Sequence, residues 1–322
     1  MQTTFKNVYQ LLDYYKEDSR CNELLELQRW GGKPKCPHCG YDKKIYRTNR
    51  GYRCTNKGCC KKFSVTTGTI CESSHIPLRY WFAAIYLLTA HKKGISSHQL
   101  ARDLGVTQKT AWFLNHRVRE MLKENNPSLL TGTIEVDETY IGGKEKFKHG
   151  KDHVKRSATP TKTLITSGAS KYITPDTKTP VFGILQRNGI LRVQKVGNAK
   201  AKTLIPIMVA NVKKDSTICS DEHTGYASLT KKGFKHETVN HKEKEYVRGI
   251  AHTQNLDGYW SLLKRQIIGI HHSISAKHLQ RYCNESAYRY NSRTITDQER
   301  FFGVLKQSEK RLTYKALIAK EQ

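Results

Sequence analysis

The chain has 322 residues, of which 56 are Lys or Arg and 28 are Asp or Glu, giving a formal net charge of +28. Hydrophobic residues make up 37% of the chain, which is enough for packed cores and excludes wholesale disorder. The positive charge is spread along the sequence and indicates a polyanionic partner, with nucleic acid the first to test.

No segment of the sequence is expected to enter a membrane. The longest apolar run, residues 81–89, is far shorter than the about 20 residues that a membrane-spanning helix needs. Residues 1–20 contain neither the apolar core nor the cleavage site of a signal peptide. We therefore expect a soluble cytoplasmic protein, whose cysteine thiols stay reduced.

Residues 1–30 are predicted to be a helical segment, because apolar side chains recur at helical spacing from residue 5 until Gly31 and Gly32. Residues 31–67 are predicted to be a zinc ribbon. Here Cys-x2-Cys is followed after fourteen residues by Cys-x4-Cys, and a hairpin that joins the pairs makes a tetrahedral thiolate site. The expected ligands of a structural Zn²⁺ are Cys36, Cys39, Cys54 and Cys59. Because Cys60 is adjacent to Cys59, either thiol could be the fourth ligand, and we favour Cys59. Reduced core cysteines without a metal are the alternative.

Residues 68–125 are predicted to be helical and to contain a helix-turn-helix. The segment 95–120 has two helical halves around Gly105, with Ser96 or Ser97 and then Thr107 as N-terminal caps. Its expected inward residues are Leu100, Leu104, Val106, Ala111 and Trp112. The side chains expected to meet DNA phosphates or base edges are Gln108, Lys109, Asn115, Arg117 and Arg119. An ordinary helical hairpin with a solvated basic face would have the same pattern.

A linker is predicted at residues 124–127, after which strands mix with helices, as in an α/β layer. The predicted strands are residues 131–141, 180–185, 191–196, 217–220 and 234–239, and the predicted helices are residues 201–212, 256–267 and 276–290. Residues 144–178 have little periodicity and are interpreted as a mobile basic loop, whose part at 144–162 is expected to neutralise DNA phosphates.

Three carboxylates in this half form a candidate catalytic site. Asp137 lies within a strand, Asp221 directly follows another, and Asp257 begins an amphipathic helix that brings Lys264 to the same face two turns later. Such a set can hold two Mg²⁺ ions for phosphodiester chemistry. The alternative is structural: a strand-end cap, an Asx turn and a charge at a helix N-terminus. Glu138 alternates to the opposite face of its strand and is not expected to be a ligand.

Several motifs together resemble insertion-sequence transposases of the IS1595 (ISXO2-like) type. They are CPHCG at 36–40, KKFSVTTGTI at 61–70, QLARDLGVTQKTAW at 99–112, VDETYIGGKEK at 136–146, SDEHTGY at 220–226, and the block at 252–293. The resemblance implies an α+β multi-domain protein with an RNase H-like catalytic domain at 128–300 and a C-terminal tail at 301–322. It also implies a DDE-type enzyme that uses Mg²⁺ or Mn²⁺ and acts as a homo-oligomer on double-stranded DNA, at the element's inverted repeats and at the target. Such an enzyme acts in the bacterial cytoplasm, associated with the nucleoid when bound.

The resemblance assigns the first two catalytic carboxylates to Asp137 and Asp221. The third position is commonly Glu in similar sequences and is Asp257 here, while Asn255 is held as a substitute or supporting ligand because some branches of the family use Asn. Arg265 is added to the expected DNA-binding residues. Trp260 is expected to pack in the core or to stack on an extruded base. A catalytically impaired or domesticated transposase that acts as a DNA-binding regulator, and a nuclease that cuts without rejoining, are the alternative functions.

Overall fold

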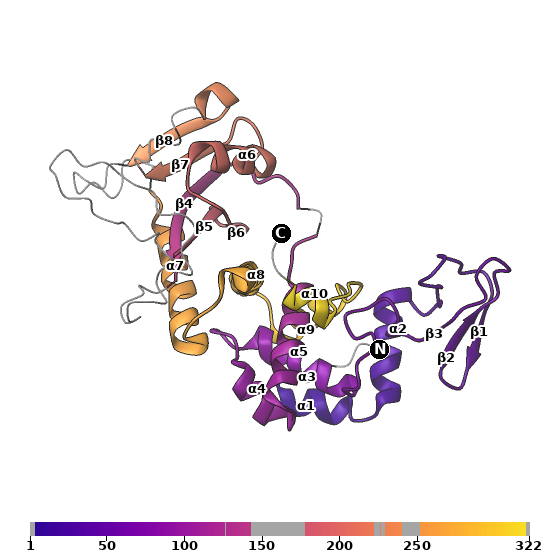
Figure 1. Cartoon of the computed structure of the whole chain (residues 1–322). Coiled ribbons are helices and arrows are strands. Elements are labelled where there is room, and N and C mark those ends of the chain that lie inside the picture. Colours follow the sequence, from indigo (N-terminus) through magenta and orange to yellow (C-terminus); the bar gives the residue numbers. More distant parts are fainter. Residues whose placement is uncertain are drawn as a thin grey trace. The chain divides into compact units, whose positions relative to one another are not determined.

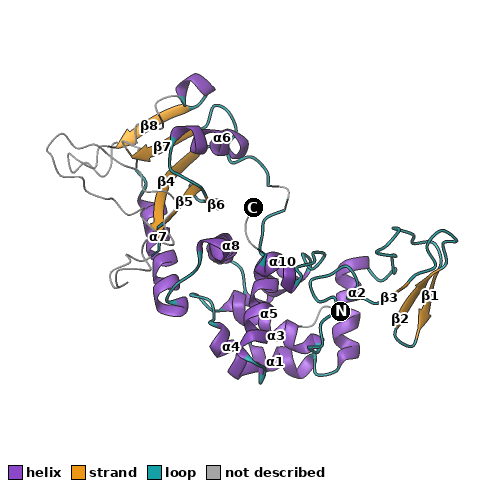
Figure 2. Ribbon diagram, viewed as in Figure 1, coloured by secondary structure: helices purple, strands orange, loops and turns teal. Residues whose placement is uncertain are grey.

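The computed structural model describes residues 4–125, 127–142, 178–221, 226, 229–239 and 252–319, so most of the predicted basic loop lies outside the described residues. The chain divides into two compact units (Figure 1). Unit 1 consists of Met1–Pro127, Gly269–His271 and Lys277–Gln322, and unit 2 of Ser128–Ile268 and His272–Ala276. Unit 1 is mainly helical and unit 2 contains the larger sheet (Figure 2).

The N-terminal part of unit 1 forms as the sequence predicts, with a break between the first two helices. Its helices are α1 (Val8–Tyr14), α2 (Asp18–Trp30), α3 (Leu78–Ala90), α4 (Ser97–Leu104) and α5 (Gln108–Met121). Ser96 caps α4 by accepting a hydrogen bond from the Gln99 amide, and Thr107 caps α5 in the same way. Between them Gly105 has a φ of +64°, a conformation that favours glycine. The helix–Gly turn–helix expected at 95–120 is therefore present.

The end of the chain belongs to the core of unit 1. The helices concerned are α8 (Ala276–Asn291), α9 (Asp297–Leu305) and α10 (Tyr314–Ile318). Phe301 and Leu317 are almost fully buried, and Phe301 meets Phe82 of α3 with ring centroids 5.4 Å apart. A domain boundary at residue 300 and a separate tail at 301–322 were expected. In the structure apolar residues of this segment instead pack in the core of unit 1. The sequence patterns of the short helices α9 and α10 did not reveal that their apolar faces complete a core begun before residue 125.

A buried ion network joins α5 to α8, and it corrects one expectation. Arg119 is 1% exposed and pairs with Glu285, which also accepts a hydrogen bond from Arg289. Arg117 is 6% exposed and Asn115 is 1% exposed. These three α5 side chains were expected on a DNA-facing surface, but the helix turns them inward, because α5 is covered on more than one side.

In the described part of unit 2, five strands form one mixed sheet in the order β6-β5-β4-β7-β8. The strands are β4 (Thr133–Ile141), β5 (Thr179–Gln186), β6 (Leu191–Lys195), β7 (Thr217–Asp221) and β8 (Lys235–Val239). The first three form an antiparallel meander, and β7 and β8 run parallel to β4. This order, with the first strand in the centre, confirms the predicted RNase H-like fold.

Alternation along β4 gives the sheet two different faces. Ile134 and Val136 pack with Leu204 and Met208 of α6 (Ala201–Asn211), which connects β6 to β7. The alternate residues Glu135 and Asp137 point to the other face, where hydrogen bonds join them to α7 (Gln254–Gln266). The central strand thus carries an apolar core on one face and carboxylates on the other.

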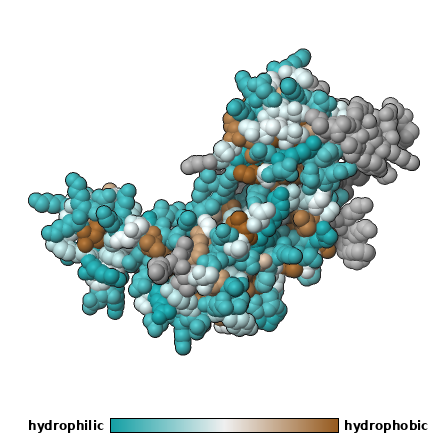
Figure 3. Space-filling model, turned by 180° about the vertical axis from the view of Figure 1, so that it is seen from behind, coloured by the Kyte–Doolittle hydropathy of each residue, from teal (hydrophilic) through white to brown (hydrophobic). Residues whose placement is uncertain are grey.

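The visible face in Figure 3 is mostly hydrophilic, with apolar side chains in scattered spots, as the composition predicts. Among the described residues, no helix combines the length and apolarity needed to cross a membrane.

Candidate active site and zinc site

The carboxylate cluster is built by the parallel pairing of β4 with β7. Their register places Glu135 beside Cys219, so two residues further along each strand Asp137 and Asp221 lie at equivalent positions. One carboxylate oxygen from each of Asp137, Glu138 and Asp221 lies within 4.8 Å of the others. Carboxylate groups this close favour a divalent cation, because hard oxygen ligands suit Mg²⁺ and Mn²⁺.

Asp137 is held in place by Trp260 of α7. The indole Nε1 donates a hydrogen bond to Asp137 Oδ2 at 2.7 Å, and the tryptophan is 4% exposed. The ring fits against the sheet only because β5 has glycine at position 183, where a Cβ would lie 2.7 Å from the Trp260 ring. Trp260 therefore packs in the core, which is one of the two alternatives given for it from the sequence. It also orients a carboxylate of the cluster.

Burial raises the pKa of Asp137 to about 7, with the negative charges of Asp221 and Asp257 adding to the effect and the Trp260 hydrogen bond opposing it. A carboxylate poised near neutrality among other carboxylates is typical of functional sites. A bound cation would stabilise its ionised form.

Glu138 is the residue of the cluster that the sequence argument excluded. Strict alternation along β4 directs the Cβ of Glu138 away from that of Asp137. The neighbouring strand β7, however, ends at Asp221, next to Asp137 and Glu138. With its longer side chain, Glu138 brings its carboxylate to the other two, and it accepts a hydrogen bond from the Tyr226 hydroxyl. In the sequence, the only sign that Glu138 belongs to this cluster is that it is an acidic residue directly after Asp137.

The remaining expected catalytic residues lie on α7, outside the cluster. Asp257 is exposed in the first turn of the helix, where Thr253 Oγ1 donates to its Oδ2 at 3.4 Å. Lys264 is exposed further along the helix. Asn255 donates from Nδ2 to Glu135 Oε1 at 2.8 Å. Of these three, Asp257 is the one whose charge affects the pKa of Asp137.

Glu135 anchors the start of α7 to the central strand. It is fully buried, and its carboxylate accepts hydrogen bonds from Asn255 Nδ2 and from the Leu256 backbone amide at 3.2 Å. Arg187, which directly follows β5, also pairs with Glu135, at an Nε–Oε1 distance of 2.8 Å. The carboxylate thus holds the N-terminal turn that carries Asp257 against β4, without being part of the cluster itself.

The second site is the cysteine group of the small sheet formed by β1 (Ile45–Thr48), β2 (Gly51–Cys54) and β3 (Lys62–Phe63). The sulfur atoms of Cys36, Cys39, Cys54 and Cys59 all lie within 4.8 Å of one another. Four thiols without a carboxylate or an open position fit a structural Zn²⁺. Cys60 is not in the group: its φ is +50°, and its thiol donates instead to the Asn56 carbonyl.

Residues 129–291 match the family model of the ISXO2-like transposase domain, and residues 16–62 match that of the transposase zinc-ribbon domain. The chain is also 30% identical over 274 residues to an uncharacterized protein in transposable element ISH50 of Halobacterium salinarum, covering 83% of this chain and 89% of that protein. The chain belongs to the ISXO2-like transposase family. The resemblance to IS1595-type transposases and the zinc ribbon are thereby confirmed.

Two weaker similarities accompany these matches. An uncharacterized transposase-like protein of Haemophilus influenzae is 29% identical over 117 residues, covering 35% of this chain and 87% of that protein. A chain in the crystal structure of the Mos1 strand transfer complex aligns over 74% of this chain and 78% of its own, with 15% identity and a TM-score of 0.27. The fold assignment rests on the sheet order described above.

Two of the expected DNA-binding residues of the helix-turn-helix lie at an exposed position. Gln108 and Lys109 are exposed in the first turn of α5, and Gln108 Nε2 donates to Ser97 Oγ at 2.9 Å. Arg265 is exposed on α7 of the transposase and donates from Nε to the Ser261 carbonyl.

We expect Trp260→Phe to raise the pKa of Asp137 further above about 7. The substitution keeps an aromatic ring in the core but removes a hydrogen bond that stabilises the ionised carboxylate. A carboxyl NMR titration of the metal-free transposase measures the pKa, and the pH at which Mn²⁺ binding rises should move upward with it. Trp112→Phe, in unit 1, is the control, and an unshifted Asp137 titration in Trp260→Phe would contradict the assigned role of the indole.

Replacing Cys36 by Ser should remove the zinc of the transposase, about one ion per chain. The ribbon core is small, with Tyr52 and Phe63 stacked next to Cys36 and Cys54, so loss of the metal should also unfold β2. Atomic absorption gives the metal content, and hydrogen exchange of the β2 amides reports the unfolding. Cys60→Ser is the matched control and should retain zinc. Loss of zinc in that variant would show that Cys60, and not Cys59, is the fourth ligand.

Proposed function

We propose that this transposase binds the terminal inverted repeats of its insertion sequence, cleaves DNA there, and transfers the freed 3′ ends to target DNA in a metal-dependent reaction. The observation that carries the proposal is the carboxylate cluster on adjacent parallel strands of an RNase H-like sheet. Such a cluster, in a family of transposases and in a chain of charge +28, supports polynucleotidyl transfer.

The cluster suits a hard divalent cation, Mg²⁺ or Mn²⁺, because its donors are carboxylate oxygens and the burial of Asp137 disfavours its charge when no cation is near. Asp137 and Asp221 would hold the ions, with Asp257 as the third ligand from α7 and Glu138 as an additional oxygen donor. When bound, the ions supply activation of a water or 3′-hydroxyl and stabilisation of the leaving oxygen.

The other side chains position these groups or meet the DNA. Trp260 fixes the orientation of Asp137, and Glu135 holds the first turn of α7. We assign Lys264 and Arg265, both exposed on α7, to DNA phosphates near the site. Asn255, whose amide is turned to Glu135, is proposed as a supporting residue and not as a direct ligand.

End recognition is assigned to the zinc ribbon and to the first turn of α5, through Gln108 and Lys109. We propose that the transposase acts as a homo-oligomer that brings two DNA ends together, in the cytoplasm of its host. The high positive charge supports a binding affinity that falls steeply with salt.

One observation favours a second function, that of a catalytically impaired copy which binds DNA as a regulator. Asp257 stands where Glu is common in similar sequences, and it is exposed and outside the carboxylate cluster. A side chain one methylene shorter must hold its metal closer to the helix.

Cleavage of labelled end DNA with Mg²⁺ or Mn²⁺ tests the two functions, using the wild type, Asp257→Ala and Asp257→Glu. The proposed enzyme should cut, and should lose cutting in Asp257→Ala. Cutting by Asp257→Glu alone would identify a decayed copy that binds DNA. Nicked ends without joined products would indicate a nuclease, and no cutting by any form would refute the catalytic assignment.

A further inference from the structure

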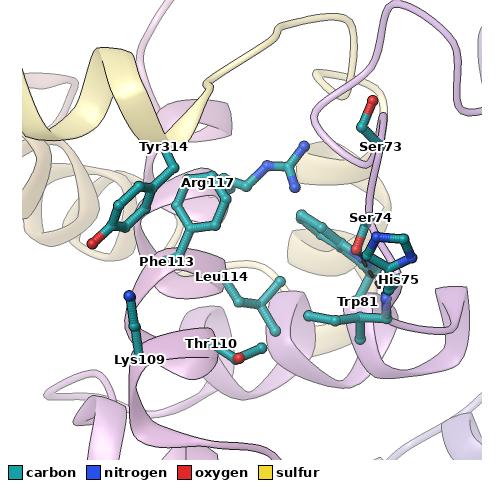
Figure 4. A pocket seen from close by; sticks show the side chains of 11 residues that line it. Ser73, Ser74, His75, Trp81, Lys109, Thr110, Phe113, Leu114, Arg117 and Tyr314 are labelled. Atoms are coloured by element: carbon teal, nitrogen blue, oxygen red, sulfur yellow. Dashed lines mark hydrogen bonds between the residues drawn. The ribbon is translucent and has the colours of Figure 1, made fainter.

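A cavity of about 370 Å³ in unit 1 lies against the second helix of the helix-turn-helix. Its lining combines rings and cations: Trp81 from α3, Phe113 and Arg117 from α5, and Tyr314 from α10, with Lys109 at the start of α5 (Figure 4). Serine and threonine hydroxyls, a histidine and the apolar side chains of Ile76 and Leu114 form the rest of the wall, and none of the described residues that line it carries a carboxylate. The size is within the range of sites that bind small ligands.

Arg117 gives this cavity an unused donor. The side chain is 6% exposed, and its guanidinium lies 4.9 Å from the Trp81 ring centroid and 5.1 Å from that of Phe113. Nη2 donates to the Glu72 carbonyl at 2.8 Å, but the buried Nε has no hydrogen-bond partner among the described residues. A buried, unpaired guanidinium nitrogen is costly, and an acceptor from a ligand would satisfy it.

The rings provide a stacking surface beside these cations. Phe113 and Tyr314 meet edge to face with centroids 5.5 Å apart, and Lys109 Nζ lies 5.5 Å from the Tyr314 centroid. Tyr314 is 38% exposed, so part of its ring is accessible. Aromatic rings next to an arginine and a lysine match a ligand with a flat ring and an adjacent anion, because bases stack on aromatic side chains and phosphates accept hydrogen bonds from Arg and Lys.

We propose that this cavity binds an unpaired nucleotide of a DNA strand, with its base against Tyr314 and Phe113 and its phosphate at Lys109 and Arg117. The inference rests on the proposed function, because the strand would be that of DNA held at the first turn of α5. The cavity would then detect a base that has left the duplex, which is a different task from reading paired bases in a groove.

The test compares binding of two short fluorescein-labelled strands to the full-length protein at fixed salt. One is oligo(dA), and the other is an abasic strand of the same length and charge. The wild type should bind oligo(dA) about tenfold more tightly, a ratio set by stacking of a base on an aromatic ring. Tyr314→Ala should lose this preference, while Tyr314→Phe should keep it.

Two charge variants separate the phosphate contact from general attraction. Lys109→Gln should weaken binding of both strands more than Lys315→Gln does, since Lys315 is exposed on α10 and does not line the cavity. Free dAMP should compete weakly. Equal binding of the two strands by the wild type, or an unchanged preference in Tyr314→Ala, overturns the inference. Displacement of oligo(dA) by dAMP at equal concentration would assign the cavity to a free mononucleotide and also overturn it.

Cleavage assays on the same preparations keep the two proposals separate. If the wild type cuts end DNA but shows no preference for the strand with bases, the proposed function stands and the nucleotide site is refuted. If the wild type shows the preference but does not cut, the nucleotide site stands and the catalytic function is refuted.

Discussion

Replacing Asp137 by Asn should lower the rate of end cleavage by at least about 10³-fold while leaving DNA binding nearly unchanged. The amide has the shape of the carboxylate and can still accept the hydrogen bond from Trp260 Nε1, so the packing of α7 on the sheet should survive. What is lost is the negative charge of one of the three carboxylates in the cluster. Asp221→Asn should have a similar effect, because the two side chains share the site.

Asp215→Asn is the matched control for this loss. Asp215 lies just before β7, at the end of the strand opposite to Asp221, and it is exposed. Its φ of +66° is a conformation that Asn tolerates. Cleavage rates from single-turnover assays and melting temperatures of all three variants decide the outcome. Wild-type cleavage by Asp137→Asn would show that the chemistry occurs elsewhere.

The largest expected effect on stability is that of Glu285→Gln, which should reduce the free energy of unfolding of unit 1 by about 3–5 kcal/mol. Glu285 is fully buried between Arg119 and Arg289, and the two arginines would stay buried after losing the negative charge of this carboxylate. The comparison variant is Glu120→Gln, which breaks a partly exposed pair with Arg281 and should change the stability by about 1 kcal/mol or less. Urea denaturation of both variants measures the difference; equal effects would contradict the network's importance.

Glu285 should also make the free energy of unfolding of unit 1 depend on pH. Burial alone would raise the pKa of Glu285, but the charges of Arg119 and Arg289 outweigh it and lower that pKa to about 2. Because the folded-state pKa is below the ordinary value of 4.5, ionised Glu285 stabilises the fold fully above that value. This contribution is lost as the pH falls toward about 2, so the stability gap between wild type and Glu285→Gln should narrow over that interval.

Local patterns were enough to predict the parts of the structure that depend on neighbouring residues. The caps at Ser96 and Thr107 and the glycine turn between α4 and α5 follow from short sequence signals. The attachment of Asp137 and Asp221 to strands was predictable because each lies in or directly after a recognisable strand. Which strands are neighbours was available only from the family resemblance.

The sequence could not show contacts between distant residues. Arg119 looks like a surface cation of an amphipathic helix until Glu285, 166 residues later, is placed beside it. Glu138 joins the cluster because β7 ends next to it, and Trp260 reaches Asp137 because position 183 has no side chain. Each of these depends on three-dimensional packing between segments whose individual patterns give no information about one another.

The discontinuous course of unit 1 has a consequence during synthesis. The ribosome releases the residues of unit 2 before the last segment of unit 1, whose Phe301 and Leu317 are needed to fill the core around α3 and α5. Because domains fold as their residues emerge, the sheet can form while the helical body still lacks part of its interior. A nascent or prematurely terminated transposase can therefore have its carboxylate-bearing strands in place before the core around α5 is complete.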